Sequence, residues 1–429
     1  MAKLDYFIDS HCHMFTIADI PICKPLELVV GKSDNIGTYG LLAFSIFARA
    51  FINPEKKLQH YMPYIKYFEN ESLQNVDNLS NEVLAALDEA KSSGYPIETD
   101  NVVLTPLIMD FDLGASVTKL RAQADRLVAA IGAKDNRNVK ILPFLGIHPG
   151  RTDADTLINR YKVTSVANRG GYKLTNNGDF VGIKLYPALG FDAYPDSDPQ
   201  LRASYLSFYK KLANMEIPVT VHCQKSSFEL TKNAEEFTRA DNWELVFAGL
   251  SDSEANKLRI NFAHFGGEDG VKRTVWFQSK DENQLNFYSD NAFNKIRRDS
   301  WTYSIVKMIK KYRNAYADIS AFDFTDQEAV PALHWLLYKD SQGLLVEDDR
   351  NYPYKLEDKL LWGSDYPMIL NSDMASYSAL LRKFITSFDF TGRKKARFEY
   401  PAPDPSMNQN VFLKKLFCDN PKKFLFDTV

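Results

Sequence analysis

The 429-residue sequence contains only four cysteines, at positions 12, 23, 223 and 418, and no C-x-x-C pair. Cysteines so few and so scattered exclude a disulfide scaffold and a zinc ribbon. The glycine-rich signatures of nucleotide-binding loops are absent, and so is the G-x-S-x-G turn that presents the nucleophile of many serine hydrolases. Any chemistry of this chain must therefore depend on residues of another kind.

The sequence also lacks a strong excess of charge and a long hydrophobic run. Its 52 Lys and Arg residues nearly balance 55 Asp and Glu residues, for a net charge of −3. This balance excludes the concentrated basic face that nucleic-acid binding requires. The longest apolar stretch, residues 39–52, is interrupted by Arg49 and is shorter than the ~20 residues that span a bilayer. The first residues lack the apolar core of a secretory signal, so we expect a cytoplasmic protein with no membrane partner.

What the sequence does contain is a series of short aliphatic runs, each ending in polar residues or glycine. Such runs are typical of buried parallel strands. Amphipathic helical patterns at 116–131, 198–214 and 326–338 lie between some of them, and parallel strands need helical crossovers of this length. Eight strands predict a (β/α)8 TIM barrel that forms a single domain over residues 1–429. The predicted strands are 4–9, 102–109, 139–147, 180–185, 218–221, 258–263, 315–319 and 359–362.

Two long insertions interrupt this alternation, at about 14–100 after the first strand and at 266–314 after the sixth. Both appear helical in pattern, and the aromatic-rich segment 59–68 belongs to the first. Both leave the carboxyl ends of their strands, where the active sites of such barrels lie. The first insertion could therefore cap the site, or the insertions could mediate subunit contacts in a homo-oligomer.

Histidine and aspartate side chains stand where several of these apolar runs end. His11 and His13 follow the first run, and alternation along a strand directs both imidazoles to one side. His222, His264 and Asp365 end three further runs. Because barrel closure brings strand ends together, these side chains predict a site for zinc or a similar divalent metal.

The motifs around these residues resemble the amidohydrolase superfamily. The similarity is to its amidohydrolase 2 branch, which includes enzymes like aminocarboxymuconate-semialdehyde decarboxylase. The resemblance implies a metal held by His11, His13, His222 and Asp365, and places His264 where the family has a histidine that activates water or polarises the substrate. The motifs are HCH at 11–13, GIKLYP at 182–187, VHC at 221–223, AHFGG at 263–267, GSDYP at 363–367 and DNPKKFLF at 419–426.

Metal-activated water predicts a hydrolase that cleaves a C–N amide or a C–O ester or lactone bond of a small organic molecule. Asp365 would then accept a proton from water and return it to the leaving group. The alternative is non-oxidative decarboxylation of an aromatic or unsaturated carboxylic acid on the same site. The same ligands serve both reactions, so the motifs leave the two open.

Lys184 interrupts an apolar strand at the position where binuclear amidohydrolases carry a carboxylated lysine. It could bridge a second metal, or it could contact the substrate as an ammonium group. Zinc is the metal we expect, as one ion or, with such a bridge, two. Arg151, Tyr186 and His148 also follow strand ends and are weaker candidates for substrate contacts.

Overall fold

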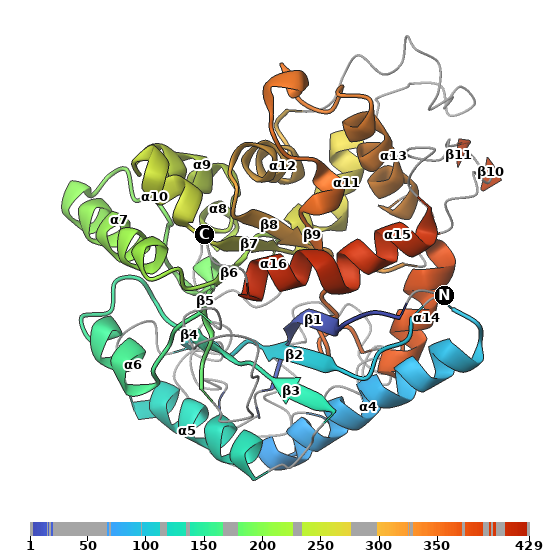
Figure 1. Ribbon diagram of the computed structural model, residues 1–429. Coiled ribbons are helices and arrows are strands. Elements are labelled where there is room, and N and C mark those ends of the chain that lie inside the picture. The colour runs from blue at the N-terminus through green and yellow to red at the C-terminus, as the bar shows by residue number, and fades with distance from the viewer. Residues whose placement is uncertain are drawn as a thin grey trace, which may run out of the picture.

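The computed structural model describes residues 3–426 except for a set of segments that includes most of residues 15–66. The excluded residues are 15, 17–18, 20–66, 68–69, 96, 112–117, 134–137, 166–178, 226–233, 276–297, 325, 327–328, 371–373, 389–393, 396–397 and 400–407. In the rest of the chain, short strands lie at the centre and helices surround them (Figure 1).

The central strands are parallel and form two sheets. One has the order β1-β2-β3 and the other the order β4-β5-β6-β7-β8-β9. Their order in each sheet follows the chain, which confirms the predicted alternation of parallel strands and crossovers. The strands are β1 (Phe7–Cys12), β2 (Val102–Pro106), β3 (Val139–Ile141), β4 (Phe144–Gly146), β5 (Gly182–Leu185), β6 (Val219–His222), β7 (Ile260–Ala263), β8 (Ala315–Asp318) and β9 (Leu360–Leu361).

The two sheets contact each other at both edges. On one side, Cys12 pairs in parallel with Tyr366, and the Ser10 N–H donates to the Trp362 carbonyl at 2.9 Å. On the other side, Leu107 pairs in parallel with Phe144. The strands are thus linked from β1 around to the segment that follows β9.

The helices cover the outside of the strands (Figure 1). Asp198 caps the helix that the sequence predicts at 198–214, since its carboxylate accepts the N–H groups of Gln200 and Leu201. The surrounding helices are α4 (Ser72–Ser92), α5 (Thr118–Gly132), α6 (Ala154–Arg160), α7 (Pro199–Asn214), α8 (Ala234–Phe237), α9 (Asp241–Ala248), α10 (Asp252–Lys257), α11 (Gly267–Val275), α12 (Trp301–Lys311), α13 (Ala329–Ser341), α14 (Tyr377–Ser387), α15 (Gln409–Lys414) and α16 (Asn420–Phe426).

The strand predicted at 139–147 is divided in the structure. β3 pairs with β2, whereas β4 pairs with β5, so the two halves belong to different sheets. The division falls at Leu142 and Pro143, and proline has no N–H to donate to a neighbouring strand. The apolar run continues through this point, which is why hydrophobicity alone predicts one strand.

The C-terminal helix α16 fills the interior at the amino ends of the strands. Phe424 stacks on Phe144 of β4, with ring centroids 6.3 Å apart, and lies 5.6 Å from the ring of Tyr316 in β8. The buried Arg259 guanidinium donates to the Phe424 carbonyl at 3.0 Å. This end is therefore packed with side chains, and the opposite, carboxyl end is the one that can hold a site.

The insertions are described in part. α4 belongs to the first, and α11 and α12 belong to the second. The segment 59–68, expected to be helical, lies outside the described residues apart from Tyr67. Among the described helices, none has both the length and the apolar character that crossing a membrane requires.

Candidate metal centre

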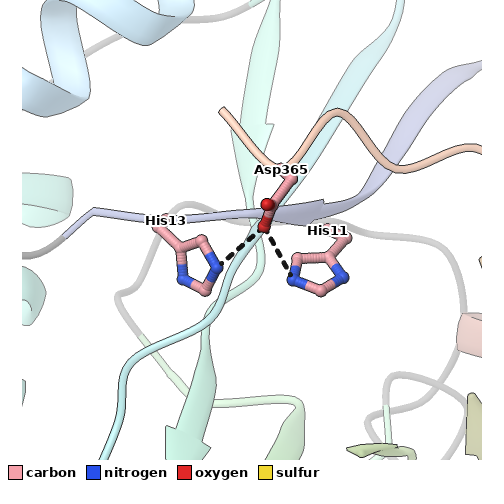
Figure 2. Close-up of side chains that lie close together, drawn as sticks. All are labelled: His11, His13 and Asp365. Atoms are coloured by element: carbon pink, nitrogen blue, oxygen red, sulfur yellow. Dashed lines mark hydrogen bonds and ion pairs between the residues drawn. The ribbon is translucent and has the colours of Figure 1, made fainter. Parts of the chain in front are cut away.

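Two histidines of β1 and an aspartate that follows β9 converge at the carboxyl end of the strands. His13 Nε2 lies 3.2 Å from Asp365 Oδ1, and His11 Nε2 lies 3.3 Å from the same oxygen (Figure 2). All three residues are buried. The alternation predicted for β1 therefore brings both imidazoles to one carboxylate.

Backbone hydrogen bonds fix these side chains relative to one another. The Asp365 N–H donates to the His11 carbonyl at 2.8 Å, and the His13 N–H donates to the Tyr366 carbonyl at 2.7 Å. Asp365 itself has a left-handed backbone, with φ of 54°. A non-glycine residue adopts this conformation at a cost, and it persists where the surroundings hold it. The interlocked strands provide that support.

The other ring nitrogen of each β1 histidine has its own partner. His13 Nδ1 lies 3.0 Å from the Leu107 carbonyl, and His11 Nδ1 lies 3.0 Å from Asp318 Oδ2. A carbonyl or carboxylate oxygen only accepts, so both Nδ1 atoms carry the proton. Both Nε2 atoms then present a lone pair, which is the state that metal ligation needs.

His264 and His222 extend this arrangement along β6 and β7. His264 Nδ1 lies 2.8 Å from Ser320 Oγ, and its Nε2 lies 3.0 Å from His222 Nδ1. His11, His264 and Asp318 form a second group of possible ligand atoms, all within 4.8 Å of one another, beside the group of His11, His13 and Asp365. His222 is in neither group, but its Nε2 is buried with no hydrogen-bond partner among the described residues.

Burial keeps these imidazoles neutral. It lowers the pKa of His11, His222 and His264 well below the usual 6.5, and neighbouring positive charge acts in the same direction. Burial alone would raise the pKa of Asp365, but its hydrogen bond with His13 and the nearby histidines outweigh that effect and lower it to about 2. The site therefore combines neutral imidazoles with a carboxylate at neutral pH.

A buried carboxylate behind β1 holds the two metal-site segments together. Asp9 Oδ1 accepts the N–H of His11 at 3.1 Å and the N–H of Ser364 at 3.0 Å. Asp9 Oδ2 accepts the hydroxyl of Tyr377 in α14 at 2.9 Å, and that hydroxyl accepts the indole N–H of Trp362 at 3.0 Å. This network joins the helical shell to both strands of the site.

Lys184 lies in β5 with only 1% of its surface exposed. Its ammonium has no hydrogen-bond partner among the described residues and lies 5.8 Å from the centre of the Tyr186 ring. Burial lowers the pKa of Lys184 to about 8, against the attraction of Asp318 and Asp365. The Tyr186 ring packs on His222, with centroids 4.4 Å apart. Both residues thus border the site.

Arg151 and His148 lie after β4 in a separate cluster. The Arg151 guanidinium bonds both oxygens of Asp110 at 3.0 Å and also pairs with Asp153 at 2.8 Å. His148 Nδ1 accepts the Gly150 N–H at 3.0 Å, and its ring contacts Phe191. The structure groups these two candidates with each other and not with the β1 histidines.

Sequence reasoning did not select Asp318 or Ser320, although both help to organise the site. Asp318 accepts from Asn261 Nδ2 at 2.6 Å and from the His264 N–H at 3.0 Å, in addition to His11. The signal was available, because Asp318 ends the apolar run 315–319 as Asp365 follows another. Ser320 carries no such signal, since serine is common after strands.

A pocket of about 280 Å³ opens beside the carboxyl ends of β6, β7 and β8. Gln224, Gly266 and Ala321 line it, each within three residues of a site residue on its strand. The pocket also contains Glu268, whose pKa is raised to about 7 by burial. Space for a small molecule therefore lies next to the histidine cluster.

The fold and the site agree with the comparison to protein families. A family model described as amidohydrolase matches residues 173–426, more than half of the chain, and the chain belongs to this amidohydrolase 2 family. Membership makes it an enzyme of hydrolase type that acts on small molecules, in a family that generally uses a divalent metal.

Comparison with solved structures gives two distant similarities. A probable 2-pyrone-4,6-dicarboxylic acid hydrolase from Acinetobacter baumannii, with citric acid bound, is 12% identical over 98% of each chain, with a TM-score of 0.45. A protein from Staphylococcus aureus assigned to the amidohydrolases is 11% identical over 99% of each chain, with a TM-score of 0.40. A comparison with curated proteins finds no significant match.

Proposed function

We propose that the chain is a single-domain, metal-dependent hydrolase with a closed (β/α)8 barrel, and that His11, His13, His222 and Asp365 hold one divalent ion, zinc by preference. The observation that carries this proposal is the pair of Nε2 atoms of His11 and His13 beside one oxygen of Asp365. The contacts at both sheet edges support barrel closure.

The residues present fit a metal ion in both geometry and chemistry. Two ligands about 2.1 Å from one ion in a tetrahedral site lie about 3.4 Å apart, close to the 3.2 and 3.3 Å measured here. The Nε2 atoms of His11 and His222 are buried and make no hydrogen bond among the described residues. Neutral imidazoles and a carboxylate are the donors that zinc prefers. A metal would satisfy these buried lone pairs.

A divalent ion bound here supplies Lewis acidity and lowers the pKa of water from about 16 towards 7. The protein's own residues then move the proton. Asp365, held as a carboxylate, accepts it and donates it to the departing nitrogen or oxygen of an amide, ester or lactone. His264 lies beside His222 and is positioned to polarise the substrate carbonyl.

Lys184 is proposed to contact an anionic group of the substrate, because its ammonium is buried beside the site without a hydrogen-bond partner among the described residues. Carboxylation of this lysine would instead bridge two ions, so a count of two metals per chain would replace this assignment. The first insertion is proposed as a cap. Tyr67, at its far end, donates to the His13 carbonyl at 3.4 Å and packs on Tyr366.

The test is a screen of small esters, lactones and amides with the zinc-loaded protein, read by release of acid or amine. A parallel screen of aromatic and unsaturated carboxylic acids is read by release of carbon dioxide. Asp365→Asn and chelated protein serve as negative controls. Asp198→Asn is the matched control, because asparagine caps α7 as well as aspartate does.

The proposal predicts hydrolysis that depends on metal, is lost in Asp365→Asn and is unchanged in Asp198→Asn. Release of carbon dioxide without hydrolysis would replace it with the decarboxylase alternative. Turnover that survives both chelation and Asp365→Asn would refute the site.

A further inference from the structure

The described residues hold a continuous chain of hydrogen bonds between the β8 carboxylate and the β6 histidine. Ser320 Oγ donates to Asp318 Oδ1 and lies 2.8 Å from His264 Nδ1, and His264 Nε2 lies 3.0 Å from His222 Nδ1. All of these side chains are buried, so water does not compete for their protons. The position of each proton can therefore be deduced from one end of the chain to the other.

The deduction starts at the carboxylate, which can only accept. The single hydroxyl proton of Ser320 is used on Asp318, so Ser320 Oγ must accept from its other neighbours. His264 Nδ1 therefore carries a proton and donates it to Ser320. The neutral His264 ring then has a bare Nε2, which must accept from His222 Nδ1.

The end of the chain is the ring nitrogen that faces the proposed metal. With its proton on Nδ1, His222 has a bare Nε2, and this is the buried atom that makes no hydrogen bond among the described residues. The second oxygen of Asp318 meanwhile accepts from His11 Nδ1 at 3.0 Å, which leaves His11 Nε2 bare as well. One carboxylate thus sets the tautomer of two proposed ligands, directly for one and through a serine for the other.

We infer that Asp318 and Ser320 are positioning residues whose hydrogen bonds fix His11, His264 and His222 in the tautomer that metal binding requires. The inference rests on the proposed metal site for its purpose, but the tautomers are properties of the metal-free protein. Outer partners of metal-bound histidines commonly change metal affinity by 10–100-fold when removed, by mis-setting the ligand rings. Ser320 is expected to act in this way across two histidines.

The test uses the full chain labelled with ¹⁵N-histidine and freed of metal. Long-range ¹H–¹⁵N spectra distinguish bare from protonated ring nitrogens, and the sequence has only seven histidines to assign. In the wild type, His11, His222 and His264 are expected with protonated Nδ1 and bare Nε2. His148 provides an internal reference of the opposite kind, because its Nδ1 accepts the Gly150 N–H.

Ser320→Ala removes the acceptor for His264, so His264 and His222 are expected to lose their single tautomer. His11 should keep its tautomer, because Asp318 Oδ2 remains. Zinc affinity, measured by competition with a chromophoric chelator, is expected to fall by about 10–100-fold. Ser320→Thr retains the hydroxyl and should restore both the tautomers and the affinity. Ser80→Ala, which removes another buried hydroxyl, in α4, is the matched control and should change neither.

The outcomes separate this inference from the proposed function. The positioning role is refuted if His222 and His264 carry the proton on Nε2 in the wild type, or if Ser320→Ala leaves their tautomers and the zinc affinity unchanged. A wild type with the expected tautomers that binds no zinc would instead refute the metal site and leave the hydrogen-bond chain standing. Loss of affinity in Ser320→Thr equal to that in Ser320→Ala would also count against the hydroxyl.

Discussion

Replacing Tyr377 by phenylalanine tests whether the buried network behind the site stabilises the fold. The hydroxyl of Tyr377 donates to Asp9 and accepts from the Trp362 indole, and all three side chains are fully buried. Phenylalanine keeps the ring and its packing but removes both hydrogen bonds. The change therefore isolates the polar contribution.

The magnitude follows from these two contacts. Loss of a hydrogen bond to a charged group costs about 1.5–3 kcal/mol, and a buried N–H left without an acceptor costs about 1–3 kcal/mol. Because no water can reach either partner, both costs apply in Tyr377→Phe. We expect the free energy of unfolding to fall by about 3–4 kcal/mol.

The assay is equilibrium unfolding in urea, followed by circular dichroism and tryptophan fluorescence. Tyr209→Phe is the matched control, since the buried Tyr209 hydroxyl makes one hydrogen bond, to the Ala193 carbonyl at 3.3 Å. It should cost about 1 kcal/mol. If Tyr377→Phe costs no more than Tyr209→Phe, the reasoning about the Asp9 network is wrong.

Three further predictions address charge. Lys310→Met leaves its buried partners Asp340 and Asp349 unpaired and should cost about 3–5 kcal/mol in urea unfolding; a loss below about 1 kcal/mol would contradict this. Burial lowers the pKa of Lys359 to about 7, so from pH 7 to 9 the unfolded chain binds more protons there than the folded chain. Stability of the wild type should rise relative to Lys359→Met by up to about 2 kcal/mol, and a difference that is constant with pH would refute it. Asp365→Asn should abolish turnover yet leave the circular dichroism spectrum intact; unfolding would show a structural role instead.

The strand positions could be predicted because parallel strands buried on both faces produce continuous apolar runs. The structure places a strand in each of the eight predicted runs. Pairing between strands is less visible in the sequence. The division at Pro143 depends on which neighbours each half meets, and that is a property of the closed arrangement and not of local hydrophobicity.

The first group of site residues could be predicted for the same reason. His11, His13 and Asp365 stand at strand ends, and parallel strands bring their carboxyl ends together. The hydrogen bonds that orient them could not, because they join residues hundreds of positions apart. Asp318 had a visible signal as a charged residue in an apolar run, whereas Ser320 is defined only by what it contacts.

The metal content of the purified protein tests the central claim most directly. Mass spectrometry of the elements, after reconstitution with zinc and removal of free metal, should find about one divalent ion per chain in the wild type. The His13→Ala/Asp365→Ala double variant, checked for folding by circular dichroism, should bind none above background. A wild type that retains no metal, or a double variant that retains as much as the wild type, would contradict the account.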